Sequence, residues 1–121
     1  MPSTTYKNGF RKLIAWQKAH MLSLMIYKYT EQFPSKESFG ITNQMRRAAA
    51  SIGANIAEGT SRKTSKDQKH FYIMAKGSLL ELDNFMELSH DLEYLNDQQY
   101  DHLLENINKT GFILSQLIDR L

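Results

Sequence analysis

The sequence contains no cysteine, which excludes disulfide bonds, cysteine-based zinc sites and cysteine nucleophiles. It has only two prolines, at positions 2 and 34, and only six glycines. Long stretches therefore run without a helix breaker, and none alternates polar and apolar residues as a half-buried strand does. No run approaches the roughly 20 apolar residues of a membrane span, and no secretory signal precedes Leu13. We expect a cytoplasmic, all-α protein with no membrane partner.

Apolar residues recur instead at the 3.6-residue spacing of amphipathic helices. This spacing predicts helices over about 13–33, 41–59, 65–94 and 97–121, with residues 1–12 as a flexible arm and 13–121 as one domain. Long helices with short connections predict an antiparallel up-down-up-down four-helix bundle.

Residues at the predicted helix ends support these boundaries. Pro34 restricts the residue before it and so ends the first helix, while Gly59 is expected to cap the second in the left-handed region. Ser65 with Gln68 has the spacing of a capping box that begins the third helix, and Asn96 is expected to cap the fourth.

The helix over 41–59 has three distinct faces. Its apolar stripe is Ile41, Met45, Ala48, Ile52 and Ile56, and small residues at Ala50, Gly53 and Ala57 would allow a neighbouring helix to come close. A polar row beside the stripe predicts a polar clamp, completed by a carboxylate of the third helix; its members are Arg47, Ser51, Asn55, Glu58 and Glu81. The clamp can be structural, fixing the helix register, or can serve function directly.

The third helix is predicted to bury one stripe and to expose further apolar residues. The inward set is Phe71, Ala75, Ser78, Leu82, Phe85, Met86, Ser89 and Leu92. A monomer would expose Trp16 or Leu22, Ile73, Leu80, Phe112 and Ile113 as apolar surface. Contiguous surface of this kind predicts self-association.

Charge is distributed unevenly along the chain. Residues 1–64 hold ten Lys and Arg against three Asp and Glu, and residues 65–121 hold five against ten. The bundle topology gathers Lys7, Arg11, Lys12, Arg62, Lys63, Lys66 and Lys69, together with Arg120, at one end. We name this set the basic end. The first seven are candidate contacts to nucleic-acid phosphates, and the opposite end is predicted to be acidic.

No catalytic or metal-binding constellation is found. Glu87 and His90 form a single Glu-x-x-His where a di-metal bundle needs two, and both are interpreted as solvated side chains. The pairs Arg62 with His70 and Arg11 with His20 are spaced too widely for a HEPN-type RNase. We therefore expect no enzyme, catalytic residue, cofactor, metal or small-molecule substrate.

Several segments resemble one family. They are QMRRAAASIGANIAEGTSR over Gln44–Arg62, FPSKESFGIT over Phe33–Thr42, AKGSLLEL over Ala75–Leu82, and the run Trp16-Gln17-Lys18-Ala19. Together they resemble the four-helix-bundle family encoded in 23S rRNA intervening sequences. Gly53 departs from the pattern, in which proline or another residue is commoner. The resemblance implies a ring, expected to be a homopentamer. The family is more distantly similar to accessory proteins of diversity-generating retroelements, which are basic pentameric barrels that bind nucleic acid and a reverse transcriptase.

The leading hypothesis is a non-enzymatic ring that binds RNA, including rRNA, or DNA through its basic end. The alternative is a structural or protein-interaction scaffold with no nucleic-acid role. An RNA-processing enzyme would need a catalytic constellation that the sequence does not contain.

Overall fold

The computed structural model describes residues 9–121, and all of its regular elements are helical. The α-helices are α1 (Ile14–Thr30), α2 (Ile41–Thr60), α3 (Ser65–Asp91) and α4 (Asp97–Asp119), and the short 3-10 helices are η2 (Gly9–Lys12) and η3 (Ser35–Glu37). The all-α prediction is confirmed. Residues 9–12, predicted as part of an arm, instead form η2, which packs against α1 and α2.

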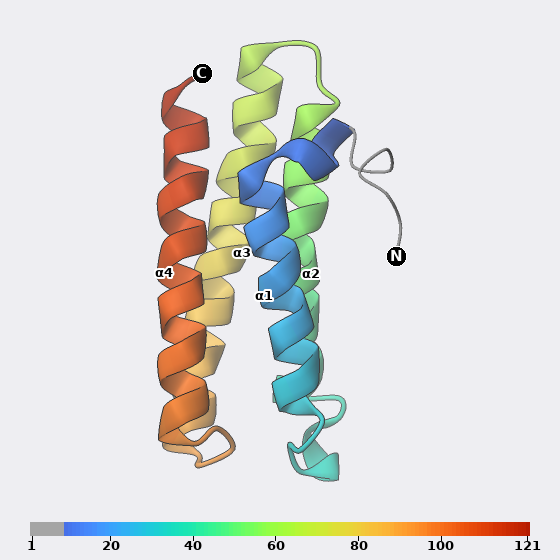
Figure 1. Ribbon diagram of the computed structural model, residues 1–121. Coiled ribbons are helices and arrows are strands. Elements are labelled where there is room, and N and C mark those ends of the chain that lie inside the picture. The colour runs from blue at the N-terminus through green and yellow to red at the C-terminus, as the bar shows by residue number, and fades with distance from the viewer. Residues whose placement is uncertain (1–8) are drawn as a thin grey trace, which may run out of the picture.

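The four α-helices lie side by side, and consecutive helices run in opposite directions (Figure 1). Each helix contacts the next in sequence, and α4 also contacts α1. The start of α1, the connection between α2 and α3, and the end of α4 therefore share one end, at the top of Figure 1. The connections between α1 and α2 and between α3 and α4 share the other end.

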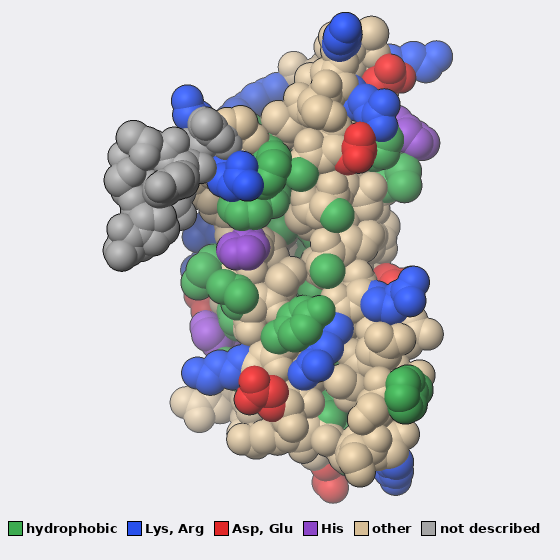
Figure 2. All heavy atoms as spheres, turned by 90° about the vertical axis from the view of Figure 1, so that its right-hand side faces the viewer, with side chains coloured by type: hydrophobic (Ala, Val, Ile, Leu, Met, Phe, Trp, Pro, Cys, Tyr) green, Lys and Arg blue, Asp and Glu red, His purple; other side chains and the backbone are tan. Residues whose placement is uncertain are grey.

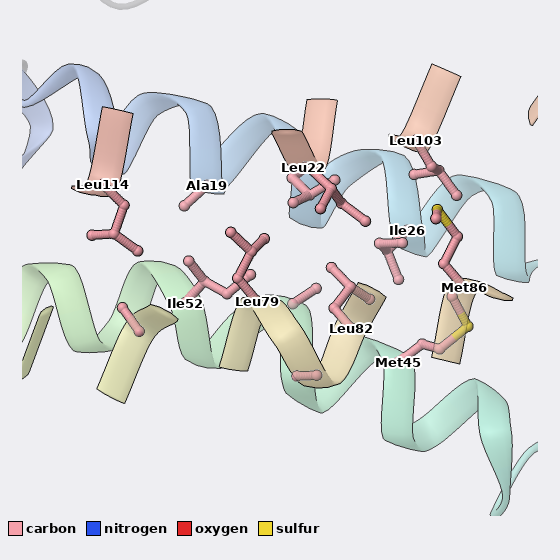
Figure 3. Close-up of a cluster of buried hydrophobic side chains, with 14 of the residues drawn as sticks. Ala19, Leu22, Ile26, Met45, Ile52, Leu79, Leu82, Met86, Leu103 and Leu114 are labelled. Carbon is pink, nitrogen blue, oxygen red and sulfur yellow. The ribbon is translucent and has the colours of Figure 1, made fainter. Parts of the chain in front are cut away.

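All four helices contribute to one apolar core. The predicted stripe of α2 is fully buried, and it packs against Ala19, Leu22 and Ile26 of α1 (Figure 3). Leu103 and Leu114 close the core from α4. Burial of apolar surface on this scale is the main stabilising contribution to a bundle.

The buried stripe of α3 differs from the prediction at four positions. Its buried residues are Tyr72, Ala75, Leu79, Leu82, Met86 and Ser89, which alternate three and four apart as in a coiled coil. Phe71, Ser78 and Phe85 are only half-buried, and Leu92 is exposed. Tyr72 takes the core position instead of Phe71, and its hydroxyl lies 3.1 Å from that of Thr60, which satisfies the buried polar atom.

Two helix ends also differ from the prediction. Helix α1 ends at Thr30, and Phe33 is buried after it in a turn that leads to Pro34. Gly59 does not cap α2 in the left-handed region, because α2 continues to Thr60 and Gly9 is the glycine with positive φ among residues 9–121. Glycine fits at position 59 for another reason, because a Cβ atom there would collide with the ring of Tyr72.

The small residues of α2 allow close packing within the chain. A Cβ atom at Gly53 would lie 3.5 Å from Nε1 of Trp16 on α1, so the indole ring covers this glycine. Ala50, in contrast, is exposed. Gly53, one of the small residues of α2, therefore provides the space in which Trp16 packs within the chain.

Candidate nucleic-acid interface

The structure brings most of the predicted phosphate-binding residues to one end of the bundle. Arg11 and Lys12 lie in η2, while Arg62, Lys63, Lys66 and Lys69 lie around the connection between α2 and α3. Arg120 follows the end of α4 at the same end (Figure 1). All seven side chains are exposed. Lys7 lies outside the described residues.

Local hydrogen bonds shape the connection that carries these charges. The Thr64 hydroxyl accepts a hydrogen bond of 3.1 Å from the backbone N–H of Asp67, so Thr64, and not Ser65 as predicted, caps α3. The Gln68 amide donates to the carbonyl oxygen of Arg62 at 3.0 Å. These bonds fix the turn that projects Lys63 and Lys66 into solvent.

Few of the positive charges are neutralised within the chain. Arg62 forms an ion pair of 2.8 Å with Glu58, and its guanidinium also lies 4.6 Å from the ring centre of Phe71. Within residues 9–121, no other member of the basic end forms an ion pair. Figure 2 shows several Lys and Arg side chains at the upper end of the face that it views, with others lower on the same face. An anionic ligand would find these charges accessible.

A hollow of about 390 Å³ lies at the same end, between the start of α1 and the end of α4. Its walls include Leu13, Ile113 and Leu117, and the charged side chains of Lys12 and Arg120 also line it. The basic end thus combines exposed cations with a partly apolar recess.

The predicted polar clamp forms only in part. The hydroxyls of Ser51 and Ser78 are 2.9 Å apart, and the Asn55 amide donates to both the carbonyl and the hydroxyl of Ser51. Arg47 and Glu81 are both exposed, and no ion pair joins them in the part of the chain that the structure describes. Glu58 pairs with Arg62 instead. The clamp is therefore a contact between α2 and α3 made by two serines and an asparagine.

Arg46, which the sequence did not single out, makes structural contacts with α1, whereas the contact with the third helix expected of Arg47 does not form. Its Nε donates to the Thr30 hydroxyl at 2.9 Å, and its guanidinium lies 4.7 Å from the ring centre of Tyr27. It ties α2 to the end of α1. Its helical position beside the buried Met45 and Ala49 is the signal that could have identified it.

The acidic end is held by hydrogen bonds between side chains. His90 and Asp97 are 2.8 Å apart, and the His90 ring stacks on Tyr100. The Tyr100 hydroxyl donates to Glu87, and this bond, with burial and nearby negative charges, raises the pKa of Tyr100 to about 12. Glu87 and His90 therefore join α3 to α4. Glu87 is exposed, as predicted, whereas His90 is half-buried, which corrects its interpretation as a solvated side chain. No cluster of three potential metal ligands occurs within residues 9–121.

An apolar groove lies between α3 and α4. Its volume is about 270 Å³, and Leu79, Leu80, Ile107 and Phe112 line it. Leu80 and Phe112 are 65% and 66% exposed, as much as many polar side chains on a surface. Of the other predicted exposed residues, Ile73 is exposed, Trp16 and Ile113 are half-buried, and Leu22 is completely buried.

None of the described helices is both long enough and apolar enough to cross a membrane.

Comparisons with known proteins agree with the fold. The chain is similar to a crystal structure described as a protein of unknown function from the S23 ribosomal protein family of Bacteroides thetaiotaomicron. The two share 23% sequence identity with a TM-score of 0.80, over 87% of this chain and 98% of the other. No curated protein sequence matches this chain.

The profile of the 23S rRNA-intervening sequence protein family matches residues 11–116, which is most of the chain. The matched range covers α1, α2 and α3 completely and nearly all of α4. The resemblance noted in the sequence is confirmed, and the chain belongs to the 23S rRNA-intervening sequence protein family.

Proposed function

We propose that this protein is a non-enzymatic nucleic-acid-binding protein that works in the cytoplasm and contacts phosphates through its basic end. The observation that carries the proposal is the exposure of Arg11, Lys12, Lys63, Lys66 and Lys69 at one end of the bundle. Phosphate contacts by such side chains release counterions from the nucleic acid, so binding weakens steeply as salt concentration rises.

RNA is the favoured ligand. The family's name contains 23S rRNA, which supports RNA as the class of ligand. The name does not specify a nucleotide sequence that the protein would recognise. Lysine and arginine side chains read the charge of the backbone and carry little base specificity. Structured RNA, including rRNA, is therefore the first ligand to test, with DNA as the comparison.

The proposal includes assembly of this antiparallel up-down-up-down bundle into a ring, expected to be a homopentamer from the family resemblance. Apolar side chains are exposed on two separate parts of the surface, Met21 and Leu24 on α1 and Leu80 and Phe112 on α3 and α4. Contact between two different surfaces is heterologous, and heterologous contacts close into rings when the rotation allows. A ring would place several basic ends side by side and raise affinity through multivalency.

A gel-shift titration of structured RNA at increasing salt concentration tests the binding proposal. Reversing three charges in K63E/K66E/K69E should weaken binding and lower the salt slope by about 2 to 3. The control K28E/K36E/K109E changes the net charge equally but lies away from the basic end, so it should bind as the unmodified protein does. Absence of salt-sensitive binding to RNA and DNA would overturn the proposal.

A structural or protein-interaction scaffold is the second candidate, and the apolar groove at Leu80 and Phe112 favours it. It predicts indifference to nucleic acid together with specific capture of one protein partner. The same titration therefore separates the two functions.

A further inference from the structure

Two groups of side chains near the basic end each contain an arginine, a phenylalanine and a histidine. In the first, the Arg11 guanidinium lies 4.5 Å from the ring centre of Phe10. Phe10 meets Trp16 nearly edge-on, with ring centres 5.1 Å apart. Trp16 stacks on His20 at 4.7 Å with an angle of 14° between the rings. We name this group the first stack; an arginine is at one end and an exposed histidine at the other.

The second stack repeats the arrangement on other elements. The Arg62 guanidinium lies 4.6 Å from the ring centre of Phe71, and Phe71 meets His70 edge-on at 5.3 Å. Arg62 and His70 are exposed, while Phe71 is half-buried. Both stacks therefore present an arginine and a histidine ring to solvent. Phe10 and Trp16 lie between them in the first stack, and Phe71 lies between them in the second.

The two stacks flank the second half of α2. Trp16 of the first stack covers Gly53, and a Cβ atom at Gly59 would lie 3.0 Å from the Cβ atom of Phe71 in the second. Figure 2 shows hydrophobic and histidine side chains directly beside the Lys and Arg side chains of the upper end. Stacking surfaces and phosphate-binding charges thus occupy the same region of the molecule.

Exposed aromatic and histidine rings beside basic side chains favour unpaired strands over duplexes. A duplex keeps its bases stacked inside and offers phosphates to a protein surface, whereas an unpaired strand also offers the faces of its bases. Aromatic rings and guanidinium planes bind such faces with little sequence preference. Exposed rings in fixed positions would add nothing to the binding of an intact duplex.

We propose that the basic end binds single-stranded nucleic acid, with unpaired bases stacking on His20 and His70 while neighbouring lysines contact the phosphates. This inference rests on the proposed function and narrows its ligand to unpaired strands, such as the loops of a structured RNA. The arginines contribute both charge and a flat surface, because a phenylalanine ring supports one face of each guanidinium.

Fluorescence anisotropy with labelled oligo(rA), oligo(dA) and the duplex of oligo(rA) with oligo(rU) tests the proposal. The unmodified protein should bind the single strands more tightly than the duplex at equal salt. H20A/H70A should lose about tenfold or more in affinity for single strands and little for the duplex. H20F/H70F, which keeps the rings and removes the titratable nitrogens, should retain single-strand binding. The control H102A removes a histidine at the opposite end and should change neither affinity.

Equal affinity for single strand and duplex would overturn the stacking proposal and leave the proposed function intact. Unchanged single-strand binding in a folded H20A/H70A variant would also overturn the stacking proposal and leave the proposed function intact. Absence of binding to every probe would instead remove the proposed function itself. Thermal unfolding followed by circular dichroism checks that each variant is folded, and all substituted histidines are exposed, so their removal should leave the core unchanged.

Discussion

Gly59 lies directly against the ring of Tyr72. A Cβ atom built on Gly59 would come within 2.7 Å of Cε1 of Tyr72, closer than carbon atoms can approach without displacement. The two residues bring the end of α2 and the start of α3 together beneath the basic end. The geometry of the connection that carries Arg62 and Lys63 therefore depends on glycine at position 59, which has no Cβ atom to collide with Tyr72.

Replacing this glycine should destabilise the bundle. Gly59→Ala should lower the free energy of unfolding by about 1 to 2 kcal/mol, because displacement of the Tyr72 ring outweighs the better helix propensity of alanine. Gly77→Ala is the matched control, since nothing lies within 4 Å of its added Cβ atom. It should stabilise α3 by up to about 1 kcal/mol. Urea denaturation at one fixed protein concentration measures both; a stabilising Gly59→Ala would contradict the packing argument.

The cap of α3 gives a second test. Thr64→Ala should cost about 1 kcal/mol of unfolding free energy, because the backbone N–H of Asp67 loses its acceptor. Ser65→Ala, one residue later, should cost a few tenths of that amount. Thermal melts of the two variants compare the positions directly. A larger loss at Ser65 would assign the cap to the residue predicted from the sequence.

Glu93 adopts a conformation that usually requires glycine. Its φ is 65°, and the N–H groups of Glu93 and Tyr94 donate to the carbonyls of His90 and Ser89, which makes a Schellman turn at the end of α3. Glu93→Gly should therefore raise the free energy of unfolding by about 0.5 to 1 kcal/mol. Asp91→Gly, in the helical region, should instead lower it by a similar amount. Chemical denaturation that ranks the two variants in the opposite order would refute this conformation.

The tyrosine at the acidic end predicts an alkaline transition. The pKa of Tyr100 is raised to about 12 by its hydrogen bond to Glu87, by burial and by neighbouring carboxylates, against about 10 in an unfolded chain. The folded state holds the proton more tightly, so this contribution is fully present below pH 10 and is lost as pH rises through 12. The tyrosinate absorbance of the unmodified protein minus that of Tyr100→Phe should show a midpoint near pH 12. A midpoint near 10 would exclude the bond.

Self-association should depend on the apolar groove. Leu80→Glu combined with Phe112→Glu places charge on the exposed surface between α3 and α4, and should convert the proposed ring to monomers. Phe39→Glu, which alters a side chain 96% exposed in the connection between α1 and α2, should leave the mass unchanged. Light scattering measures both. A monomeric unmodified protein would remove the ring from the proposed function.

Helix positions and the stripe of α2 could be predicted because they follow from periodicity, a property of the residues alone. The rotation of α3 could not, because choosing Tyr72 over Phe71 depends on a hydroxyl partner at Thr60 and on space at Gly59. Both conditions are contacts between α2 and α3 that depend on the tertiary structure. The capping box at Asn96 and Gln99 was predictable in part, since Asn96 is a strong cap former by itself.

The candidate site was only partly predictable for the same reason. The charges of the basic end follow from composition and topology, and the structure gathers those of its members that lie within residues 9–121. The stacking of Trp16 on His20 depends on rotamers that a sequence does not encode in a readable pattern. Arg46, and not Arg47, makes a contact between helices. The two differ by one position on the helix, about 100°, which periodicity alone does not resolve when both neighbours are arginine.

Trp16 is the single tryptophan of the chain, and it touches both Phe10 of η2 and His20 of α1. Its fluorescence emission therefore reports on the contact between η2 and α1. Circular dichroism reports on the four helices together. The molecule carries its own probe for local detachment of η2. A change in emission that precedes loss of helicity would mark this segment as a cooperative unit separate from the core.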